Sequence, residues 1–374
     1  MPGAAVDSPF FSDRELGGVF EKVRSGTRLE FEDGVKLFRS RDFSGVGWLA
    51  NFVRERLHGK NAHFSNYLNL NPTNICVNRC LFCHFFRDSG APDAYVLSRD
   101  AVLETVANAV ALHGVREIHI VSGLNDAVSP DYYFEIVSWV REAAPSVFIK
   151  AYTAVEIDYL SRRTGLGAGE VLRQLQTRGI GSIPGGGAEI FSEDVRGKIC
   201  PRKINAGRWL EIHKIAHRLG IPSNATMLYG HIERVEDRVD HLLRLRALQD
   251  ETSGFNAFIP LPYQTGKEPR EDLLKDSVPD GITDLKVCSA ARLLLDNIPH
   301  IRVHWPAIGL RFAQAALSFG ADDLGGTAVC EKILKGNQSG EPEPAARDEM
   351  IRLIRESGFT PLEVTSNYAS FCPA

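Results

Sequence analysis

Short apolar runs alternate with amphipathic stretches along most of the chain, and the two patterns predict different elements. Runs rich in β-branched and aromatic residues predict strands at 64–70, 117–121, 147–153, 181–184, 224–229, 257–261, 301–305 and 322–324. Apolar residues spaced three and four apart predict helices at 99–113, 132–143, 168–178, 206–219, 235–249, 284–295 and 310–319. Strands that alternate with helices indicate a parallel sheet covered by helices.

The repeat count favours one closed architecture. About eight strand–helix units predict an α/β fold of the (β/α)8 TIM-barrel type, and a doubly wound open sheet is the alternative. We expect an N-terminal helical extension over residues 1–60, the barrel over 61–325, and a C-terminal extension over 326–374 packed on the barrel. Barrels carry their reacting groups at the carboxyl ends of the strands.

Composition excludes several classes of protein. The 374 residues carry a net charge of −4, which argues against a strongly basic nucleic-acid surface. No apolar stretch approaches the roughly 20 residues that span a bilayer, so no membrane partner is expected. The chain has seven cysteines, and an odd count in a long chain argues against a secreted disulfide framework. We therefore expect a cytoplasmic protein.

Three of the cysteines fall within eight residues, directly after the first predicted strand. Cys76, Cys80 and Cys83 have the spacing C-x3-C-x2-C. Three thiolates on one loop can hold three irons of a [4Fe–4S] cluster and leave the fourth iron open. A structural zinc site is the alternative, but it needs four ligands, and no second cysteine pair is present. The remaining cysteines share no ligand spacing: Cys200, Cys288, Cys330 and Cys372.

This cysteine loop resembles that of the radical S-adenosylmethionine (SAM) superfamily. The resemblance implies that the open iron chelates the amino and carboxylate groups of SAM, and that reductive cleavage yields methionine and a 5′-deoxyadenosyl radical. It implies that Phe82 packs near the adenine. It also implies a reducing electron donor such as a flavodoxin or a ferredoxin.

Further segments resemble the menaquinone-forming branch of that superfamily. They are residues 182–191, 223–233, 238–252, 258–261 and 316–324, and the likeness extends over roughly residues 45–368. The sequences of residues 224–231 and 152–158 are most similar to those of the aminofutalosine synthase family. That family adds the deoxyadenosyl radical to 3-[(1-carboxyvinyl)oxy]benzoate, a dicarboxylate aryl enol ether, and consumes SAM as a co-substrate. Rearrangement with decarboxylation then gives 6-amino-6-deoxyfutalosine.

Two positions depart from the family pattern. Asn125 and Gln264 stand where histidines are usual. Three alternatives therefore stay open: a cyclic dehypoxanthinyl futalosine synthase, a divergent paralogue with another acceptor, and a non-catalytic cluster-binding partner protein.

Candidate SAM contacts follow the second to fourth strands. The resemblance implies backbone contacts from Ser122 and Gly123. Thr153, Glu156 and Glu189 are candidates for the ribose or ammonium groups, and each acid could instead serve the first turn of a helix. The glycines at 185–187 would let backbone approach a ligand closely, or form a tight turn without one.

Candidate substrate residues lie near the later strands. Asn224, Tyr229 and His231 cluster at the fifth strand, and alternation places Asn224 and Tyr229 on opposite faces. Tyr263 and Trp305 could stack on an aryl ring or belong to the core. The two carboxylates of the expected substrate need cationic partners. The candidates near strand ends are Arg87, Arg202 and Arg311.

Overall fold

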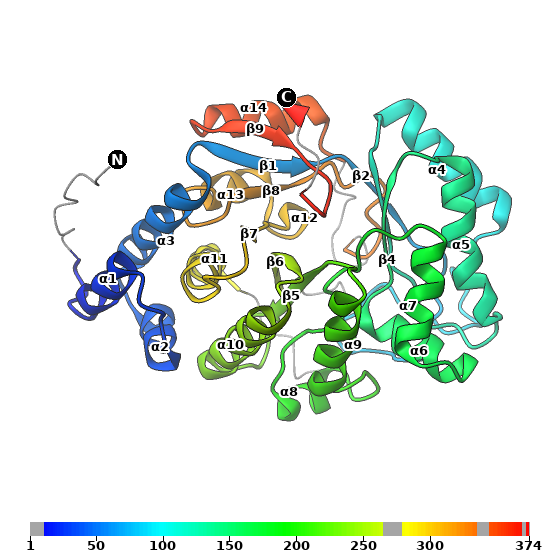
Figure 1. Ribbon diagram of the computed structural model, residues 1–374, viewed down its shortest axis with the longest axis horizontal. Helices are drawn as coiled ribbons and strands as arrows, with labels where there is room; N and C mark the ends of the chain where they lie inside the picture. Colours follow the sequence, from blue (N-terminus) through cyan, green and yellow to red (C-terminus); the bar gives the residue numbers. More distant parts are fainter. Residues whose placement is uncertain (1–10, 265–278, 335–343, 369–371, 374) are drawn as a thin grey trace.

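Parallel strands surrounded by helices form the body of the protein (Figure 1). The structure is a computed structural model that describes residues 11–264, 279–334, 344–368 and 372–373. The first ten residues of the predicted N-terminal extension, residues 265–278 of the predicted barrel, and residues 335–343, 369–371 and 374 of the predicted C-terminal extension lie outside those ranges.

The strands fall into three sheets. Their bounds are β1 (Asn61–Ser65), β2 (Tyr67–Leu70), β3 (Glu117–Ile120), β4 (Phe148–Ala151), β5 (Ser223–Tyr229), β6 (Phe255–Pro262), β7 (His300–Ile301), β8 (Asp323–Gly326), β9 (Thr360–Glu363) and β10 (Cys372–Pro373). The sheet orders are β2-β3-β4, β5-β6-β7 and β10-β9-β1-β8. All pairs are parallel except β9 with β10, so the α/β class with parallel sheets is confirmed.

Isolated bridges connect the sheets where the ladders stop. Ser182 bridges to Lys150 on β4, and Ile183 bridges to Ser223 on β5. Arg302, just after β7, bridges to Asp323 on β8. The expected strand at 181–184 thus contributes only single bridges, and the described residues form interrupted sheets rather than one closed ladder.

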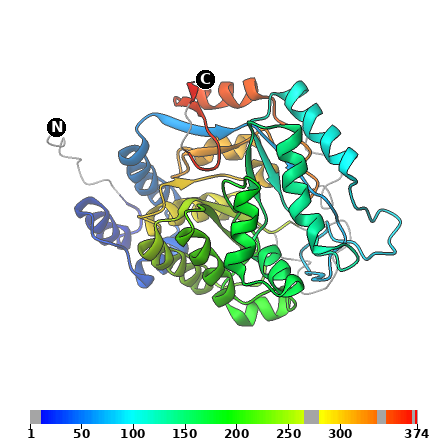
Figure 2. The same cartoon turned by 45° about the vertical axis from the view of Figure 1, so that its right-hand side comes forward.

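Helices cover the outside of the sheets (Figures 1 and 2). Their bounds are α1 (Glu15–Ser25), α2 (Phe31–Arg39), α3 (Phe43–His58), α4 (Arg99–His113), α5 (Pro130–Ala143), α6 (Ala154–Thr164), α7 (Ala168–Thr177), α8 (Glu193–Ile199), α9 (Ala206–Arg218), α10 (Val235–Thr252), α11 (Gly281–Leu294), α12 (Trp305–Ile308), α13 (Leu310–Ala316) and α14 (Arg347–Glu356). Within the N-terminal extension, α3 packs on α11, and α2 packs on α10 and α11.

Three elements differ from the sequence prediction for local reasons. The strand expected at 301–305 ends at Ile301, and Trp305 begins α12 because Pro306 suits a first helical turn. The helix α6 was not predicted; it begins at a capping box in which Thr153 and Glu156 each accept a backbone N–H of the other. The C-terminal extension does more than pack on the outside, since β9 pairs with β1 (Figure 1).

A buried ionic network ties β1, β7 and β8 together at their amino ends. The Asp322 carboxylate is fully buried and pairs with the Arg292 guanidinium. Its Oδ2 atom also lies 2.6 Å from Nδ1 of His300 and 3.1 Å from Nδ1 of His63. Burial alone would raise the pKa of Asp322, but His300 and Arg292 hold it well below its ordinary value. The carboxylate therefore stays ionised inside the protein.

Replacing Asp322 with asparagine is expected to destabilise the fold by about 3–5 kcal/mol, because the buried Arg292 loses its counter-charge. Since the folded-state pKa is depressed, the wild-type protein keeps this stabilisation above the unfolded pKa of about 3.9 and loses it as the pH falls further. Denaturant titration at pH 7 measures the loss. Glu21→Gln, which removes an exposed pair with Arg24, should cost less than about 1 kcal/mol. If both variants lost the same free energy of unfolding, the stabilising role of the buried Asp322–Arg292 pair would be contradicted.

Candidate active site

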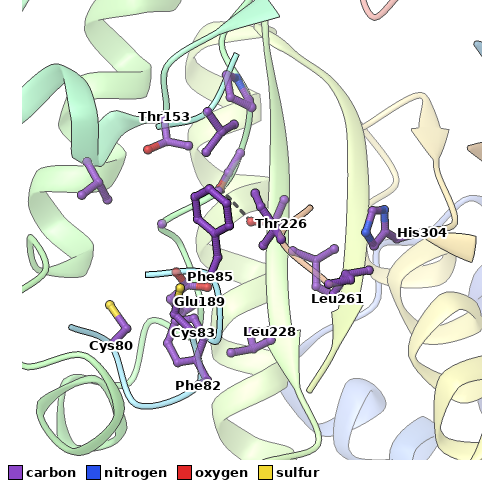
Figure 3. Close-up of a pocket in the computed structure, with 18 of the residues that line it drawn as sticks. Cys80, Phe82, Cys83, Phe85, Thr153, Glu189, Thr226, Leu228, Leu261 and His304 are labelled. Carbon is purple, nitrogen blue, oxygen red and sulfur yellow. Dashed lines mark hydrogen bonds between the residues drawn. The ribbon is translucent and has the colours of Figure 1, made fainter. Parts of the chain in front are cut away.

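A cavity of about 380 Å³ opens between the cysteine loop and the carboxyl ends of the strands (Figure 3). All three cysteines of the loop line it, together with Phe82 and Phe85. Alternate residues of the strands complete the wall, as the two-residue period of a strand requires. On β5 these are Asn224, Thr226 and Leu228, and on β6 they are Ile259 and Leu261.

Backbone contacts hold the cysteine loop against the sheet. The Cys76 N–H donates to the Arg87 carbonyl, and the Val77 N–H donates to the Leu124 carbonyl. The Arg87 guanidinium donates to the carbonyls of His84 and Phe86 at 2.8 and 2.9 Å and to Asp93 at 2.7 Å. Arg87 was predicted as a substrate partner. It instead braces the loop, and it is not among the described residues that line the cavity.

The charge of Lys203 governs the environment of the thiols. Burial raises the pKa values of Cys80 and Cys83, and Lys203 opposes that rise. The Lys203 ammonium pairs with the Glu189 carboxylate and lies 5.1 Å from the centre of the Phe82 ring. Figure 3 shows Glu189 beside Cys83 and Phe82. A nearby positive charge favours the thiolate form of a cysteine, and Lys203 supplies such a charge here.

Ser122, Thr153 and Glu156 meet on one side of the cavity. The Glu156 carboxylate accepts the Ser122 N–H at 2.6 Å and the Thr153 N–H at 2.7 Å. Burial raises the pKa of Glu156 to about 7, against the opposing effect of these hydrogen bonds. The structural alternative for Glu156, an acid in the first helical turn, is therefore present, although Glu156 also lines the cavity. The Ser122 Oγ atom is buried with no hydrogen-bond partner among the described residues.

The glycine run at 185–187 lets backbone form part of the cavity wall. A Cβ atom at Gly185 would come within 2.6 Å of the Asn224 carbonyl oxygen. Gly187 has a φ of +86°, which favours glycine. The Thr226 hydroxyl donates to the Gly185 carbonyl at 2.7 Å and fixes the run on β5. Both the close approach and the turn expected from the sequence are thus present.

Gly123 is expected to be essential for loading the site. A Cβ atom there would come within 2.2 Å of the Ile75 carbonyl oxygen, one residue before Cys76. Gly123→Ala should displace the cysteine loop and lower the iron bound per chain after anaerobic reconstitution, with the helical circular-dichroism signal unchanged. Gly90→Ala is the matched control, because no atom lies within 4 Å of its Cβ position. Full iron loading by both variants would contradict the steric argument.

Strand alternation separates the predicted residues of β5. Asn224 lines the cavity, whereas the Tyr229 hydroxyl points away and donates to Asp284 at 2.7 Å. His231 is held by the Leu228 carbonyl at 3.1 Å and by Glu233 at 3.0 Å. Neither Tyr229 nor His231 is among the described residues that line the cavity, so the structure does not bring them together with Asn224.

The remaining substrate candidates divide in the same way. Tyr263 lines the cavity. Trp305 does not, and its indole N–H donates to the Gly326 carbonyl at 2.6 Å, which makes it a core residue. Arg202 donates to the Val77 carbonyl at 3.1 Å, and Arg311 is exposed on α13. Within the described part of the chain, no predicted arginine reaches the cavity.

The cations that do line the cavity were missed from the sequence. They are Lys150 on β4, Lys203, and Arg302 just after β7. A lysine at the centre of an otherwise apolar strand is the signal that could have identified Lys150. Asn125 does not line the cavity and instead accepts the Ala127 N–H in a turn at 3.0 Å, whereas Gln264 lines it.

The donor set fits a [4Fe–4S] cluster and SAM. Cys76, Cys80 and Cys83 are free thiols that share one loop, face one cavity and lie near a lysine. The cavity also offers an unsatisfied buried hydroxyl at Ser122 and an acid at Glu156.

Comparison with known proteins agrees with this geometry. A radical SAM superfamily model matches residues 70–245, and a model of the CofH/MqnC C-terminal region matches residues 252–371. The chain is 42% identical over 357 residues to the aminodeoxyfutalosine synthase of Thermus thermophilus, covering 95% of this chain and 96% of the relative. It is 38% identical over 322 residues to a 5-amino-6-(D-ribitylamino)uracil–L-tyrosine 4-hydroxyphenyl transferase of Methanopyrus kandleri, covering 85% and 87%.

A solved structure supports the fold. Methylornithine synthase (PylB) superposes with a TM-score of 0.73 at 15% identity, covering 93% of this chain and 98% of that one. The match to the superfamily model and the 42% identity to the Thermus thermophilus relative show that the chain belongs to the radical SAM superfamily. Within it, the chain belongs to the branch that carries the CofH/MqnC C-terminal region, which confirms the family resemblance drawn from the sequence. None of the described helices is long and apolar enough to cross a membrane.

Proposed function

We propose that this chain is an aminodeoxyfutalosine synthase of menaquinone biosynthesis. One observation carries the proposal: near-complete coverage of the Thermus thermophilus synthase at 42% identity. The cavity supports it, since it places the cysteine loop, an apolar strip on β6 and buried cations around one space. The acceptor is the dicarboxylate enol ether 3-[(1-carboxyvinyl)oxy]benzoate.

The residues then divide into two groups. Cys76, Cys80 and Cys83 would hold a [4Fe–4S] cluster, which supplies the electron that cleaves SAM to methionine and the 5′-deoxyadenosyl radical. Ser122 and Glu156 bind and orient SAM, with the backbone of the 185–187 run against it. Glu189 and Lys203 fix the charge next to the thiols. The apolar wall excludes water while the new C–C bond forms.

The surrounding architecture completes this proposal. We infer a barrel-like arrangement of the three sheets, which the isolated bridges at Ser182, Ile183, Arg302 and Val329 support. The described free thiols suit a reducing cytoplasm. A flavodoxin or a ferredoxin supplies the electron.

Parallel assays with two alternative acceptor mixtures test the proposal. The enzyme is reconstituted and reduced without oxygen, then given SAM with either the enol ether or L-tyrosine plus 5-amino-6-(D-ribitylamino)uracil. We expect 6-amino-6-deoxyfutalosine from the first mixture only. A coupled product from the second mixture alone would overturn the proposal in favour of the transferase chemistry named for the Methanopyrus kandleri relative. Bound SAM that is never cleaved would favour a cluster-binding partner protein.

A further inference from the structure

Two buried cations, Lys150 and Arg302, line the cavity in addition to Lys203. Lys150 is the third residue of β4, three positions before Thr153 at the rim. Since β4 ends at Ala151 and Thr153 caps α6, Lys150 lies within the strand, before its carboxyl end. Arg302 follows β7, and both side chains line the cavity while being nearly inaccessible to solvent.

The carboxylates that balance these cations do not line the cavity. Glu117, at the start of β3, accepts the Ser366 N–H at 2.8 Å and lies 2.6 Å from Nε2 of His119. Asp323, at the start of β8, accepts the Tyr368 hydroxyl and the Gly325 N–H. Of the described residues, Lys150 and Arg302 line the cavity and these two acids do not. The counter-charges of Lys150 and Arg302 thus lie behind the wall, which also carries the acids Glu156, Glu189 and Glu331.

Two of the three polar contacts of the Lys150 ammonium are long. Its Nζ donates to the Ser366 hydroxyl at 2.8 Å, lies 3.3 Å from the Asn224 Oδ1 atom, and is 3.7 Å from Glu117. The bond to Asn224 is long and the ion pair with Glu117 is loose, so only one of the three donors of the ammonium has a short partner. A buried ammonium with this environment gains most from a second oxygen anion.

A flat aromatic surface lies beside the cations. The rings of Tyr67 and His119 are stacked with centroids 4.0 Å apart, and the Arg302 guanidinium lies 5.4 Å from the Tyr67 centroid. From there, Ile259 and Leu261 on β6 and Leu228 on β5 continue the wall towards the cysteine loop. Figure 3 shows Leu228 and Leu261 on the same side of the cavity as Thr226. These surfaces fit an aryl ring whose acidic substituent points towards Lys150 and Arg302.

We propose that Lys150 and Arg302 form an anchor for a carboxylate on the aromatic ring of the acceptor. This inference rests on the proposed function and names the group that orients the acceptor. The C-terminal segment takes part, because Ser366 contacts both Lys150 and Glu117 and so acts as a positioning residue. In place of the substrate arginines expected from the sequence, the anchor uses a lysine on β4 and an arginine that directly follows β7.

The test combines a variant with an analogue. Lys150→Met should raise the KM for the enol ether about tenfold to a hundredfold, the usual effect of losing a hydrogen bond to a charged group. The KM for SAM and the iron content should stay unchanged. With wild type, the KM for an analogue that carries a carboxamide in place of the ring carboxylate should exceed the KM for the enol ether by the same factor. With Lys150→Met, the analogue and the enol ether should have the same KM. Lys150→Arg should recover part of the loss.

The pH dependence of the KM for the enol ether distinguishes an anchoring role of Lys150 from a purely structural one. Burial lowers the pKa of Lys150 to about 8, so the KM of wild type for the enol ether should rise above that pH as the ammonium is lost. The charged groups facing Lys150 are Glu117, Arg302 and Asp323. The neighbouring His119 and His304 have pKa values lowered by burial to about 3 and 4 and stay neutral throughout. The rise should be absent in Lys150→Met.

Two outcomes separate this inference from the proposed function. If wild type makes the expected product but Lys150→Met keeps the same KM and still discriminates against the carboxamide, the anchor is wrong and the function stands. If wild type leaves the enol ether untouched, calorimetric titration with 3-hydroxybenzoate still tests the anchor. Binding to wild type with loss in Lys150→Met supports the anchor, and equal binding to both overturns it.

Discussion

The substitution Cys80→Ser is expected to abolish SAM cleavage. Cys80 is the most buried of the three loop thiols, and it faces the same cavity as Cys76 and Cys83. A hydroxyl is a poor iron ligand, so Cys80→Ser should not retain the cluster after anaerobic reconstitution. The rate of 5′-deoxyadenosine formation should fall by at least a thousandfold. Liquid chromatography measures this product, and iron and sulfide analysis measures the cluster.

Cys288→Ser is the matched control for that experiment. Cys288 is equally buried, but it lies on α11 and does not line the cavity. This variant should keep the iron content and the cleavage rate of wild type, with at most some loss of stability. Cleavage by Cys80→Ser at the wild-type rate, or a zinc content of one per chain with no iron, would contradict the assignment of the loop.

Replacing Lys203 with methionine should impair both the cluster and the fold around it. Lys203 opposes the burial-driven rise in the pKa of Cys80, so its removal raises that pKa further and disfavours the thiolate. Iron uptake should therefore need a higher pH than in wild type. Glu189 also loses its buried partner, which should cost about 3–5 kcal/mol of folding free energy. Iron uptake as a function of pH and denaturant titration measure the two effects.

Lys198→Met controls for the loss of a positive charge nearby in sequence. Lys198 is exposed on α8, five residues before Lys203, and it does not line the cavity. Its iron uptake should follow the wild-type pH curve. A Lys203→Met protein with that same curve would show that the lysine does not control the thiols.

The sequence predicted the parts of this protein that depend on local pattern. The helix at 99–113 was predicted with the bounds of α4, because Ser98 caps its start and Gly114 ends it in a left-handed conformation. The cysteine loop was predicted because three ligands lie within eight residues. The face of β5 that carries Asn224 follows from strand alternation once the strand is placed.

Long-range pairing explains what the sequence did not show. The Lys150–Ser366 contact joins residues 216 positions apart, and β9 reaches β1 from the opposite end of the chain. No local pattern encodes these contacts. Arg87 and Arg302 are indistinguishable by residue type near a strand end. Only the fold turns Arg302 into the cavity and turns Arg87 back onto its own loop.

Transfer of labelled carbon tests the central claim most directly. The reconstituted, reduced enzyme is incubated with 3-[(1-carboxyvinyl)oxy]benzoate and SAM that carries carbon-13 at C5′. The account predicts one product, one mass unit heavier than unlabelled 6-amino-6-deoxyfutalosine, in which the labelled carbon is bonded to a carbon from the enol ether. Label found only in free 5′-deoxyadenosine, with the enol ether recovered intact, would contradict it.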